Sequence, residues 1–428
     1  MQPNPFAGYG KPATPAQFCG RKKNLRRIFD RISQKAPVSI VGERRIGKTS
    51  LLHYIKSEQA LDTYAHDNSN HLFVSLEFKS ENTTERDFWL ELLRGLDEIS
   101  LNKPWYSLLQ ETIRELLNTQ NSIPIYQIEQ FFQRVKAWGY TPVFLLDEFD
   151  RVLFSHELDV HFFNTVRSFM VGQDDLFIMI VVSRIDLYKA PSEIVGSPFF
   201  NVFSTEQLQE FPETDFDEWL QNRLTGTSVH FNQEARKLII ETAGMHPFFS
   251  QIIASELFYN LEQDLSITPS IQQEMLLTFK QNAMPHFTYY WNHSTEEEKV
   301  WLALLSLGKK ASVPKFTRYE DIHLQELRKR SLIRMVDDEY QVFSSIFSRM
   351  IRDDVYTAIN GDTETYEKFL EEFKSSQPKE RIFRMASTAK ASLLKINPKY
   401  WGIFLQFLLN KDDPSMLLEE VAKALGAG

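Results

Sequence analysis

The segment at residues 42–50 has the residue types and the spacing of a loop that binds phosphate groups. Its first eight residues fit the Walker A pattern G-x-x-x-x-G-K-[ST] in full. The glycines of this pattern let backbone N–H groups close around phosphate oxygens, while Lys48 would bring a positive charge to the β and γ phosphates. Thr49 would offer its hydroxyl to Mg²⁺. The residues predicted to bind ATP or ADP are Gly42, Glu43, Arg44, Arg45, Ile46, Gly47, Lys48, Thr49 and Ser50.

Two carboxylates follow the apolar run at residues 143–146, in the manner of a Walker B strand. Acids at the end of a buried strand beside a phosphate loop can hold Mg²⁺ and polarise the attacking water. We therefore assign Asp147, with Thr49, to the metal and Glu148 to the general base of ATP hydrolysis. Asp150 is expected to support the site or to cap a helix. A strand that merely ends in solvated acids is the alternative.

A polar pair, Ser183-Arg184, ends another apolar run, at residues 180–182. A strand between those of the phosphate loop and the acidic pair would bring Ser183 or Arg184 near the γ-phosphate. Only ATP has that phosphate, so such a group could distinguish ATP from ADP. We predict that Ser183 binds nucleotide and that Arg184 is catalytic together with Lys48 and Glu148. A strand end with a surface arginine is the alternative.

A further short motif, far from the phosphate loop in the sequence, is Gly244-Met245-His246-Pro247. Pro247 can begin a helix at its first position. Its flat ring, or that of His246, could also pack on an adenine ring. A plain loop before a helix is the alternative for this segment, and His246 could be a core histidine.

The elements that must position these groups follow from the apolar periodicity of the chain. Short apolar strands alternate with helical segments, which predicts a mostly parallel sheet covered by helices on both faces. The helical part between residues 84 and 138 is expected to break near Pro104 and Pro124. The predicted strands are residues 37–41, 71–78, 143–146, 176–183 and a fifth near 200–203.

The chain beyond residue 205 is predicted to be mainly helical. A helix that starts at the acidic turn after Ser294, a second helix and a hairpin together predict a winged helix. The predicted helices are 214–224, 232–243, 247–264, 269–290, 294–307 and 319–331, followed by hairpin strands 332–336 and 340–343 and about four short helices within 364–425. The domains expected are an ATPase core at 1–205, a lid-like helical domain at 206–292, the winged helix at 293–358 and a C-terminal helical region at 359–428.

The composition limits the classes of function. The net charge of −9 weighs against broad electrostatic binding to nucleic acid, although a local basic patch could still bind it. A single cysteine, Cys19, excludes an internal disulfide and fits a reducing compartment. The N-terminus has no apolar signal sequence, and no run of 18 apolar residues exists. We therefore expect a cytoplasmic protein without a membrane span.

Taken together, these motifs resemble the STAND class of AAA+-related P-loop ATPases, in particular the prokaryotic archaeal-type ATPase family, over about residues 3–355. The run at 44–52, R-R-I-G-K-T-S-L-L, carries the most specific likeness. Residues 4–6 and 18–21 are similar to the family's lead-in and its F-x-G-R box. The chain departs from the family at Asn24, where Glu is usual, and at Met245, where the G-G-H-P box has its second glycine.

The resemblance implies an α/β fold with an AAA+/ASCE-like parallel sheet core, followed by a helical domain, a winged helix and a C-terminal helical region. It also implies that Gly20, Arg21 and Pro247 lie against the adenine. A protein of this class is a slow ATPase that switches between an ADP-closed and an ATP-open state, with Mg²⁺ as cofactor. ATP would often drive formation of a homo-oligomer, and many such proteins act in signalling or defence.

Two other functions remain open from the sequence. The first is a DNA-binding AAA+ ATPase of the origin-recognition or transposition-helper type, which the basic cluster at residues 21–31 and the basic segment 379–399 could serve. The acidic hairpin turn at 337–339 argues against a wing that faces DNA phosphates. The second is a nucleotide-binding scaffold without hydrolysis, against which Asp147 and Glu148 argue.

The C-terminal region is the expected contact with a protein partner or effector. An apolar set at near-helical spacing, Phe383, Trp401, Phe404 and Phe407, either contributes to that contact or forms the core of the region itself.

Overall fold

A computed structural model describes residues 2–65, 70–119, 123–172, 175–263, 266–306, 311–312 and 322–359. The chain divides into two units, which are described separately. Unit 1 comprises Met1–Val229 and Met245–Gln251, and unit 2 comprises His230–Gly244 and Ile252–Gly428. The expected C-terminal helices, with Phe383, Trp401, Phe404 and Phe407, lie outside the described residues. The four-domain division stays a prediction.

Unit 1 is built on a five-stranded parallel sheet with the order β2-β3-β4-β1-β5. Its strands are β1 (Val38–Gly42), β2 (His71–Glu77), β3 (Thr141–Asp147), β4 (Ile178–Ser183) and β5 (Ser204–Leu208). All residues of β1 and β4 are buried, because helices cover both faces of the sheet. The predicted α/β class with a parallel sheet core is confirmed.

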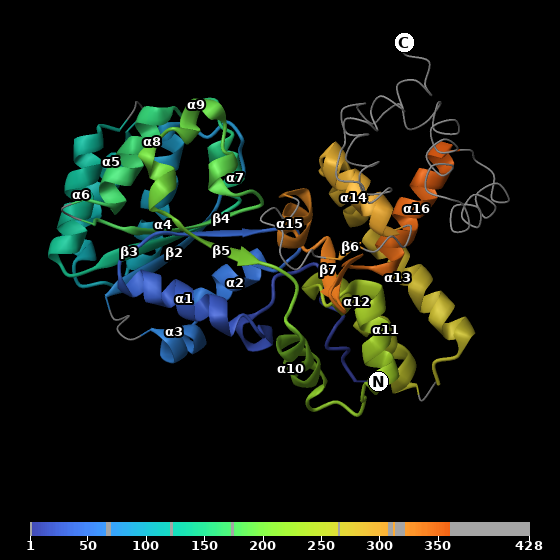
Figure 1. Ribbon diagram of the computed structural model, residues 1–428. Helices are drawn as coiled ribbons and strands as arrows, with labels where there is room; N and C mark the ends of the chain where they lie inside the picture. Colours follow the sequence, from blue (N-terminus) through green and yellow to red (C-terminus); the bar gives the residue numbers. More distant parts are fainter. Residues whose placement is uncertain are drawn as a thin grey trace, which may run out of the picture. The chain divides into compact units, whose positions relative to one another are not determined.

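The two faces of the sheet bury two separate hydrophobic clusters. Successive side chains of a strand point to opposite faces, so Phe144 and Leu146 join one cluster while Val143 and Leu145 join the other. Figure 1 shows the helices of each cluster on opposite sides of the sheet. On one face lie α1 (Lys22–Ser33), α2 (Lys48–Ile55) and α3 (Glu58–Tyr64). On the other lie α4 (Glu85–Ser100), α5 (Tyr106–Asn118), α6 (Ile125–Ala137), α7 (Asp150–Leu153), α8 (Val160–Met170) and α9 (Ser192–Val195).

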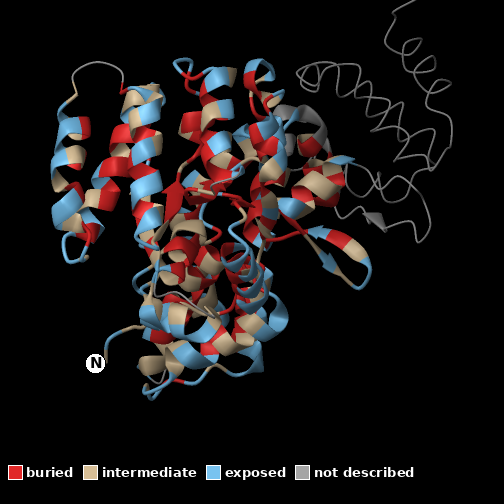
Figure 2. Cartoon of the chain, turned by 90° about the vertical axis from the view of Figure 1, so that its left-hand side faces the viewer, coloured by how far each residue is buried: buried red, intermediate tan, exposed pale blue. Residues whose placement is uncertain are grey.

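Local signals in the sequence explain where these helices begin and end. Thr84 and Asp87 form a capping box that starts α4, in which each side chain accepts a hydrogen bond from the other residue's backbone N–H. Breaks near Pro104 and Pro124 separate α4, α5 and α6, as predicted. Figure 2 shows that many helices carry buried residues along one side and exposed residues along the other, which is the amphipathic pattern of helices that cover a core.

The fifth strand was predicted near residues 200–203, and this prediction is wrong. That apolar run forms a 3₁₀-helix, η3 (Pro198–Val202), and the strand follows at β5 (Ser204–Leu208). Phe199 and Phe200 are buried against the ring of Phe163. Their side chains therefore pack from a helical turn and are not part of a strand of the sheet. β5 is an edge strand with mixed burial, which is why its sequence lacks the signal of a central strand.

The segment before α1 packs along unit 1. It contains η1 (Pro15–Gln17), and its Phe6 is fully buried edge-on against Trp219 of α10 (Glu213–Leu224), with ring centroids 5.4 Å apart. Arg223 of the same helix donates a hydrogen bond to the Pro5 carbonyl at 2.9 Å. The first turn of α12 (Pro247–Glu262) also belongs to unit 1, as does η2 (Leu187–Lys189). The lead-in is therefore part of the folded unit.

Unit 2 combines helices with a small antiparallel sheet of order β6-β8-β7. Asp337 and Asp338 both have positive φ, as a two-residue hairpin turn of type I′ requires, so the predicted hairpin is confirmed. Phe287, Phe343 and Phe347 pack together in its core. The elements are α11 (Gln233–Ala243), the remainder of α12, α13 (Pro269–Asn292), α14 (Glu296–Ser306), β6 (Ala311–Ser312), α15 (Ile322–Lys329), β7 (Ile333–Val336), β8 (Glu339–Val342) and α16 (Ser345–Ile359).

Unit 2 contains the helix, helix and hairpin order from which the winged helix was predicted, and that assignment stays a prediction. None of the described helices combines the length and the hydrophobicity that crossing a lipid bilayer requires.

Candidate nucleotide-binding site

The phosphate loop joins β1 to α2 at the carboxyl edge of the parallel sheet. Gly42 ends the strand in a tight place, since a Cβ there would overlap Ile46 and the carbonyl oxygen of Leu208. Gly47 has φ +102°, a conformation that side chains disfavour, and α2 begins at the next residue. The loop therefore has the strand–turn–helix context that a phosphate-binding loop needs, with a helix N-terminus at its end.

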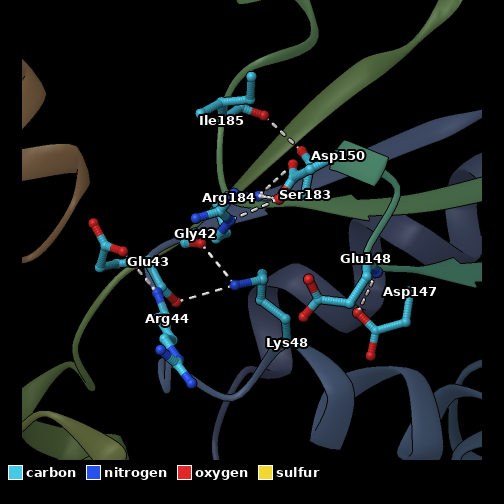
Figure 3. Close-up of polar contacts among 10 residues, drawn as sticks. All are labelled: Gly42, Glu43, Arg44, Lys48, Asp147, Glu148, Asp150, Ser183, Arg184 and Ile185. Carbon is cyan, nitrogen blue, oxygen red and sulfur yellow. Dashed lines mark hydrogen bonds and ion pairs between the residues drawn. The ribbon is translucent and has the colours of Figure 1, made fainter. Parts of the chain in front are cut away.

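Lys48 folds its side chain back over this loop. Its ammonium donates hydrogen bonds to the carbonyl oxygens of Gly42 at 2.8 Å and Glu43 at 3.1 Å (Figure 3). Burial lowers the pKa of Lys48, while the negative charges around it, including those of Asp147 and Asp150, act in the opposite direction. The lysine is thus held at the loop among several acids.

Thr49 and Asp147 meet although 98 positions separate them. The Thr49 hydroxyl donates a hydrogen bond of 2.6 Å to Asp147 Oδ2, and the backbone N–H of Glu148 donates one of 2.9 Å to Asp147 Oδ1. Asp147 is 7% exposed at the end of β3. The structure therefore brings together the two side chains that the sequence assigns to a metal.

These two side chains fit Mg²⁺ by their chemistry. Both present hard oxygen atoms, and Mg²⁺ is usually held by one or two protein side chains together with substrate phosphates and water. Among the described residues, no group of three or more His, Cys, Asp or Glu side chains forms a metal cage. Such a cage would supply all the protein ligands of a tightly held metal, whereas Thr49 and Asp147 supply two ligands to a metal that also binds nucleotide phosphates.

Glu148 follows Asp147 in a left-handed backbone conformation, with φ +54°. A non-glycine residue in this region costs about 1 kcal/mol or more, so the surrounding structure must hold it. The next residue, Phe149, does so by donating its N–H to the Val182 carbonyl of β4 at 2.9 Å. In Figure 3 the Glu148 side chain lies between those of Lys48 and Asp147.

β4 lies between β3 and β1, as the hypothesis about Ser183 and Arg184 requires. The Ser183 hydroxyl donates to the Ile185 carbonyl at 2.6 Å, so it stabilises its own turn. Arg184 is bonded to Asp150: its backbone N–H donates to the carboxylate at 3.0 and 3.2 Å, and its Nε donates to Oδ2 at 2.9 Å. Asp150, expected to support the site, holds the tip of the neighbouring strand.

Arg21 of the F-x-G-R box connects the phosphate loop to α10. Its guanidinium donates to the Ile46 carbonyl at 3.1 Å and lies over the Phe211 ring, while its backbone N–H donates to Asp215 at 2.9 Å. Burial lowers its pKa to about 10, so it stays charged at neutral pH. Gly20, with φ +73°, lies so close to Asp215 that a Cβ would collide with that carboxylate. Sequence reasoning missed Asp215 and Phe211, which carry no motif signal.

The Gly244–Pro247 segment turns the chain into α12, which begins at Pro247 as predicted. Met245 has φ +61°, the conformation that a second glycine would adopt without strain. Its carbonyl accepts a hydrogen bond of 3.2 Å from the Phe211 N–H, which joins this segment to the partner of Arg21. His246 is 1% exposed, as the core-histidine alternative expects.

Arg45 points its side chain toward the lead-in. Its guanidinium donates to the Gly10 carbonyl at 3.0 Å and lies over the Phe248 ring of α12. The Ser50 hydroxyl accepts a hydrogen bond of 3.0 Å from the Ala13 N–H. The lead-in thus lies along the phosphate loop.

Two family models match the chain. The AAA domain model matches residues 30–190, and the Novel STAND NTPase 2 model matches residues 130–309. This chain is a P-loop NTPase. The resemblance to the STAND class is confirmed by the second of these models.

Solved P-loop NTPase structures share the fold at low identity. A Walker-type ATPase of Pyrococcus abyssi is 14% identical, with a TM-score of 0.52, over 81% of this chain and 99% of that chain. The ORC2 protein of Aeropyrum pernix, in ADPNP and ADP complexes, is 12% identical, with a TM-score of 0.50, over 83% and 99%. Identities this low establish the fold alone. No curated protein sequence matches this NTPase significantly.

The structure supplies a reason for the departure at Asn24 from the family's glutamate. The Asn24 amide donates to the Glu206 carboxylate of β5 at 3.0 Å, and Glu206 is 8% exposed. A glutamate at position 24 would place its carboxylate beside that of Glu206. The nearby cation Arg27 lies farther from Glu206, at 3.7 Å. The asparagine is therefore matched to the acid on the neighbouring strand.

We predict that Asn24→Glu lowers the free energy of unfolding by about 1–2 kcal/mol at pH 7, because like charges repel strongly in a half-buried place. Urea denaturation measures the loss. Asn24→Gln, which changes size by one methylene without adding charge, is the matched control and should lose less. Adding Glu206→Gln to Asn24→Glu should restore stability, because only one carboxylate then remains at this place. A loss that persists in the double variant contradicts this explanation.

Proposed function

We propose that this chain is a STAND-type switch that binds ATP, hydrolyses it slowly to ADP and phosphate, and changes state with the nucleotide. The observation that carries the proposal is the 2.6 Å hydrogen bond between Thr49 and Asp147 beside Lys48. It joins the hydroxyl of the phosphate loop to the acid of another strand, which is the pair that holds Mg²⁺ in ATP-hydrolysing P-loop proteins.

Each residue of the site has a proposed role. Lys48 would exchange the carbonyl oxygens of Gly42 and Glu43 for the β and γ phosphates, which as anions attract an ammonium more strongly. Thr49 and Asp147 would hold Mg²⁺, whose charge helps to neutralise the phosphates. Glu148 would orient a water for attack and accept its proton.

Arg184 would bind the γ-phosphate from the tip of β4. For the base, we propose Gly20, Arg21 and Pro247 as the adenine side of the site. A contact of Arg21 supports this role: its buried guanidinium donates a hydrogen bond to the Ile46 carbonyl of the phosphate loop.

The STAND likeness at residues 130–309 supports the switch. We propose a core at 1–205, a lid-like domain at 206–292 and a regulatory winged helix at 293–358. ADP would hold the closed state, and ATP would open the chain and favour a homo-oligomer. Residues 359–428 would recruit a protein partner in a cytoplasmic signalling or defence pathway of a prokaryote.

The DNA-binding alternative has less support. Its wing would have to bring Asp337, Asp338 and Glu339 at the β7–β8 turn close to DNA phosphates, and that contact would be repulsive. The likeness to an ORC2 protein concerns the fold, and that fold also fits a switch.

We expect Lys48→Ala to weaken the binding of both ADP and an ATP analogue at least 100-fold, because the charge on the β and γ phosphates is lost. Isothermal titration calorimetry measures the affinities, and circular dichroism checks the fold. Lys56→Ala is the matched control, since Lys56 is an exposed lysine at the other end of α2 and should leave binding unchanged. Unchanged affinity in Lys48→Ala would mean that the phosphates bind elsewhere.

The hydrolysis step has a separate test. Glu148→Gln should lower ATP turnover at least 100-fold while nucleotide affinity is retained, because only the proton acceptor is removed. Mass photometry should then find this variant with ATP in the same assembly as the wild type with a non-hydrolysable analogue, and the ADP form in a smaller one. Turnover that survives the substitution excludes Glu148 as the base, and equal masses with ADP and the analogue contradict the switch.

A further inference from the structure

Asp150 is a buried acid whose carboxylate contacts Arg184, the residue that follows strand β4. It is 3% exposed, and its carboxylate accepts hydrogen bonds from both the backbone N–H and the Nε of Arg184. Arg184 differs in exposure, since 39% of its side chain is accessible. One partner of this ion pair is thus buried, while the other is partly exposed to solvent.

The ion pair lies next to the phosphate loop. The negative charge of Asp150 acts on Lys48 together with those of Glu43, Asp147 and Glu148. Figure 3 shows Arg184, Asp150 and Lys48 at the same edge of the sheet. A γ-phosphate held by Lys48 would therefore come close to the guanidinium that Asp150 holds.

We propose that Asp150 is a positioning residue that sets how strongly the site prefers ATP to ADP, by competing with the γ-phosphate for the Arg184 guanidinium. This inference rests on the function proposed above. With ADP bound, the guanidinium stays on Asp150. With ATP bound, it moves to the γ-phosphate, while the two contacts from the Arg184 backbone N–H keep the tip of β4 on Asp150.

The competition has a definite direction. A ligand shifts a two-state equilibrium only by the difference between its affinities for the two states. Part of the free energy that Arg184 gains from the γ-phosphate is therefore spent on breaking its bond to Asp150. ADP has no γ-phosphate, so Arg184 stays on Asp150 when ADP binds, and the affinity for ADP does not depend on the strength of this ion pair. Weakening the ion pair should tighten ATP binding and leave ADP binding nearly unchanged.

The experiment is a double-mutant cycle on the full chain. Asp150→Asn keeps an oxygen that can accept the Arg184 backbone N–H but removes the charge that holds the guanidinium. The affinities for ADP and for a non-hydrolysable ATP analogue are measured in four proteins: the wild type, Asp150→Asn, Arg184→Ala and the double variant. We expect Asp150→Asn to raise the preference for the analogue over ADP about 5- to 10-fold in the presence of Arg184, because charge-assisted bonds are the strong ones. We expect no such rise in the Arg184→Ala background.

The cycle separates the proposal from general electrostatics. Removing any nearby negative charge favours the more highly charged nucleotide, but that effect would be equal in both backgrounds. Asp186→Asn is the matched control: Asp186 lies two residues from Arg184, and its carboxylate accepts a hydrogen bond from the Tyr188 N–H. Any change of preference that it causes should be the same with and without Arg184. An equal rise in both backgrounds, or none in either, overturns the role of Asp150.

A second measurement covers the case in which Asp150→Asn does not fold. The Nε–H signal of Arg184 in the wild type, assigned by its loss in Arg184→Lys, should show slow hydrogen exchange with ADP and shift when the analogue replaces ADP. An unshifted signal overturns the proposal. If the wild type binds neither nucleotide, the proposed function fails as well, and the affinities of the wild type alone reveal that outcome.

Discussion

The hydrogen bond between the Thr49 hydroxyl and the Asp147 carboxylate is the contact on which the site depends. It joins the start of α2 to the end of β3, and these elements meet only because all strands of the sheet run in parallel. The carboxyl ends of parallel strands lie at one edge, where an open α/β sheet binds its ligands. β4 lies between β3 and β1, so its tip brings Ser183 and Arg184 to the same edge.

The aromatic core holds that edge in place. Phe144 of β3 packs edge-on against Phe132 and Phe177, and a hydrogen bond from the Phe149 N–H to Val182 fixes the chain just beyond Glu148. Buried aromatic pairs of this kind add about 0.5–1.5 kcal/mol each beyond the burial of their area. This rigidity allows Glu148 to keep its left-handed backbone, because a strained residue persists only where its surroundings hold it. The aromatic core and this hydrogen bond therefore help to hold Glu148 next to Asp147 at the end of β3.

The sequence predicts those parts of the site that are local along the chain. The glycine spacing of the phosphate loop, the acids after β3 and the proline that begins α12 are each signalled within a few residues. The partners of Arg21 could not be predicted in this way, since Asp215 and Phe211 lie about 190 positions away in a segment without a motif. The fifth strand was misplaced because the phenylalanines near residue 200 pack in a 3₁₀-helix, while the polar edge strand β5 has little periodicity.

The metal-binding role of Thr49 and Asp147 is the central claim, and Mn²⁺ in place of Mg²⁺ tests it most directly. Electron paramagnetic resonance measures how tightly Mn²⁺ binds to the protein in the presence of ADP. We expect Thr49→Val and Asp147→Asn each to weaken Mn²⁺ binding at least 10-fold, because the first removes an oxygen ligand and the second removes the negative charge of a carboxylate ligand. Mn²⁺ affinity equal to that of the wild type in both variants would contradict the metal-binding role.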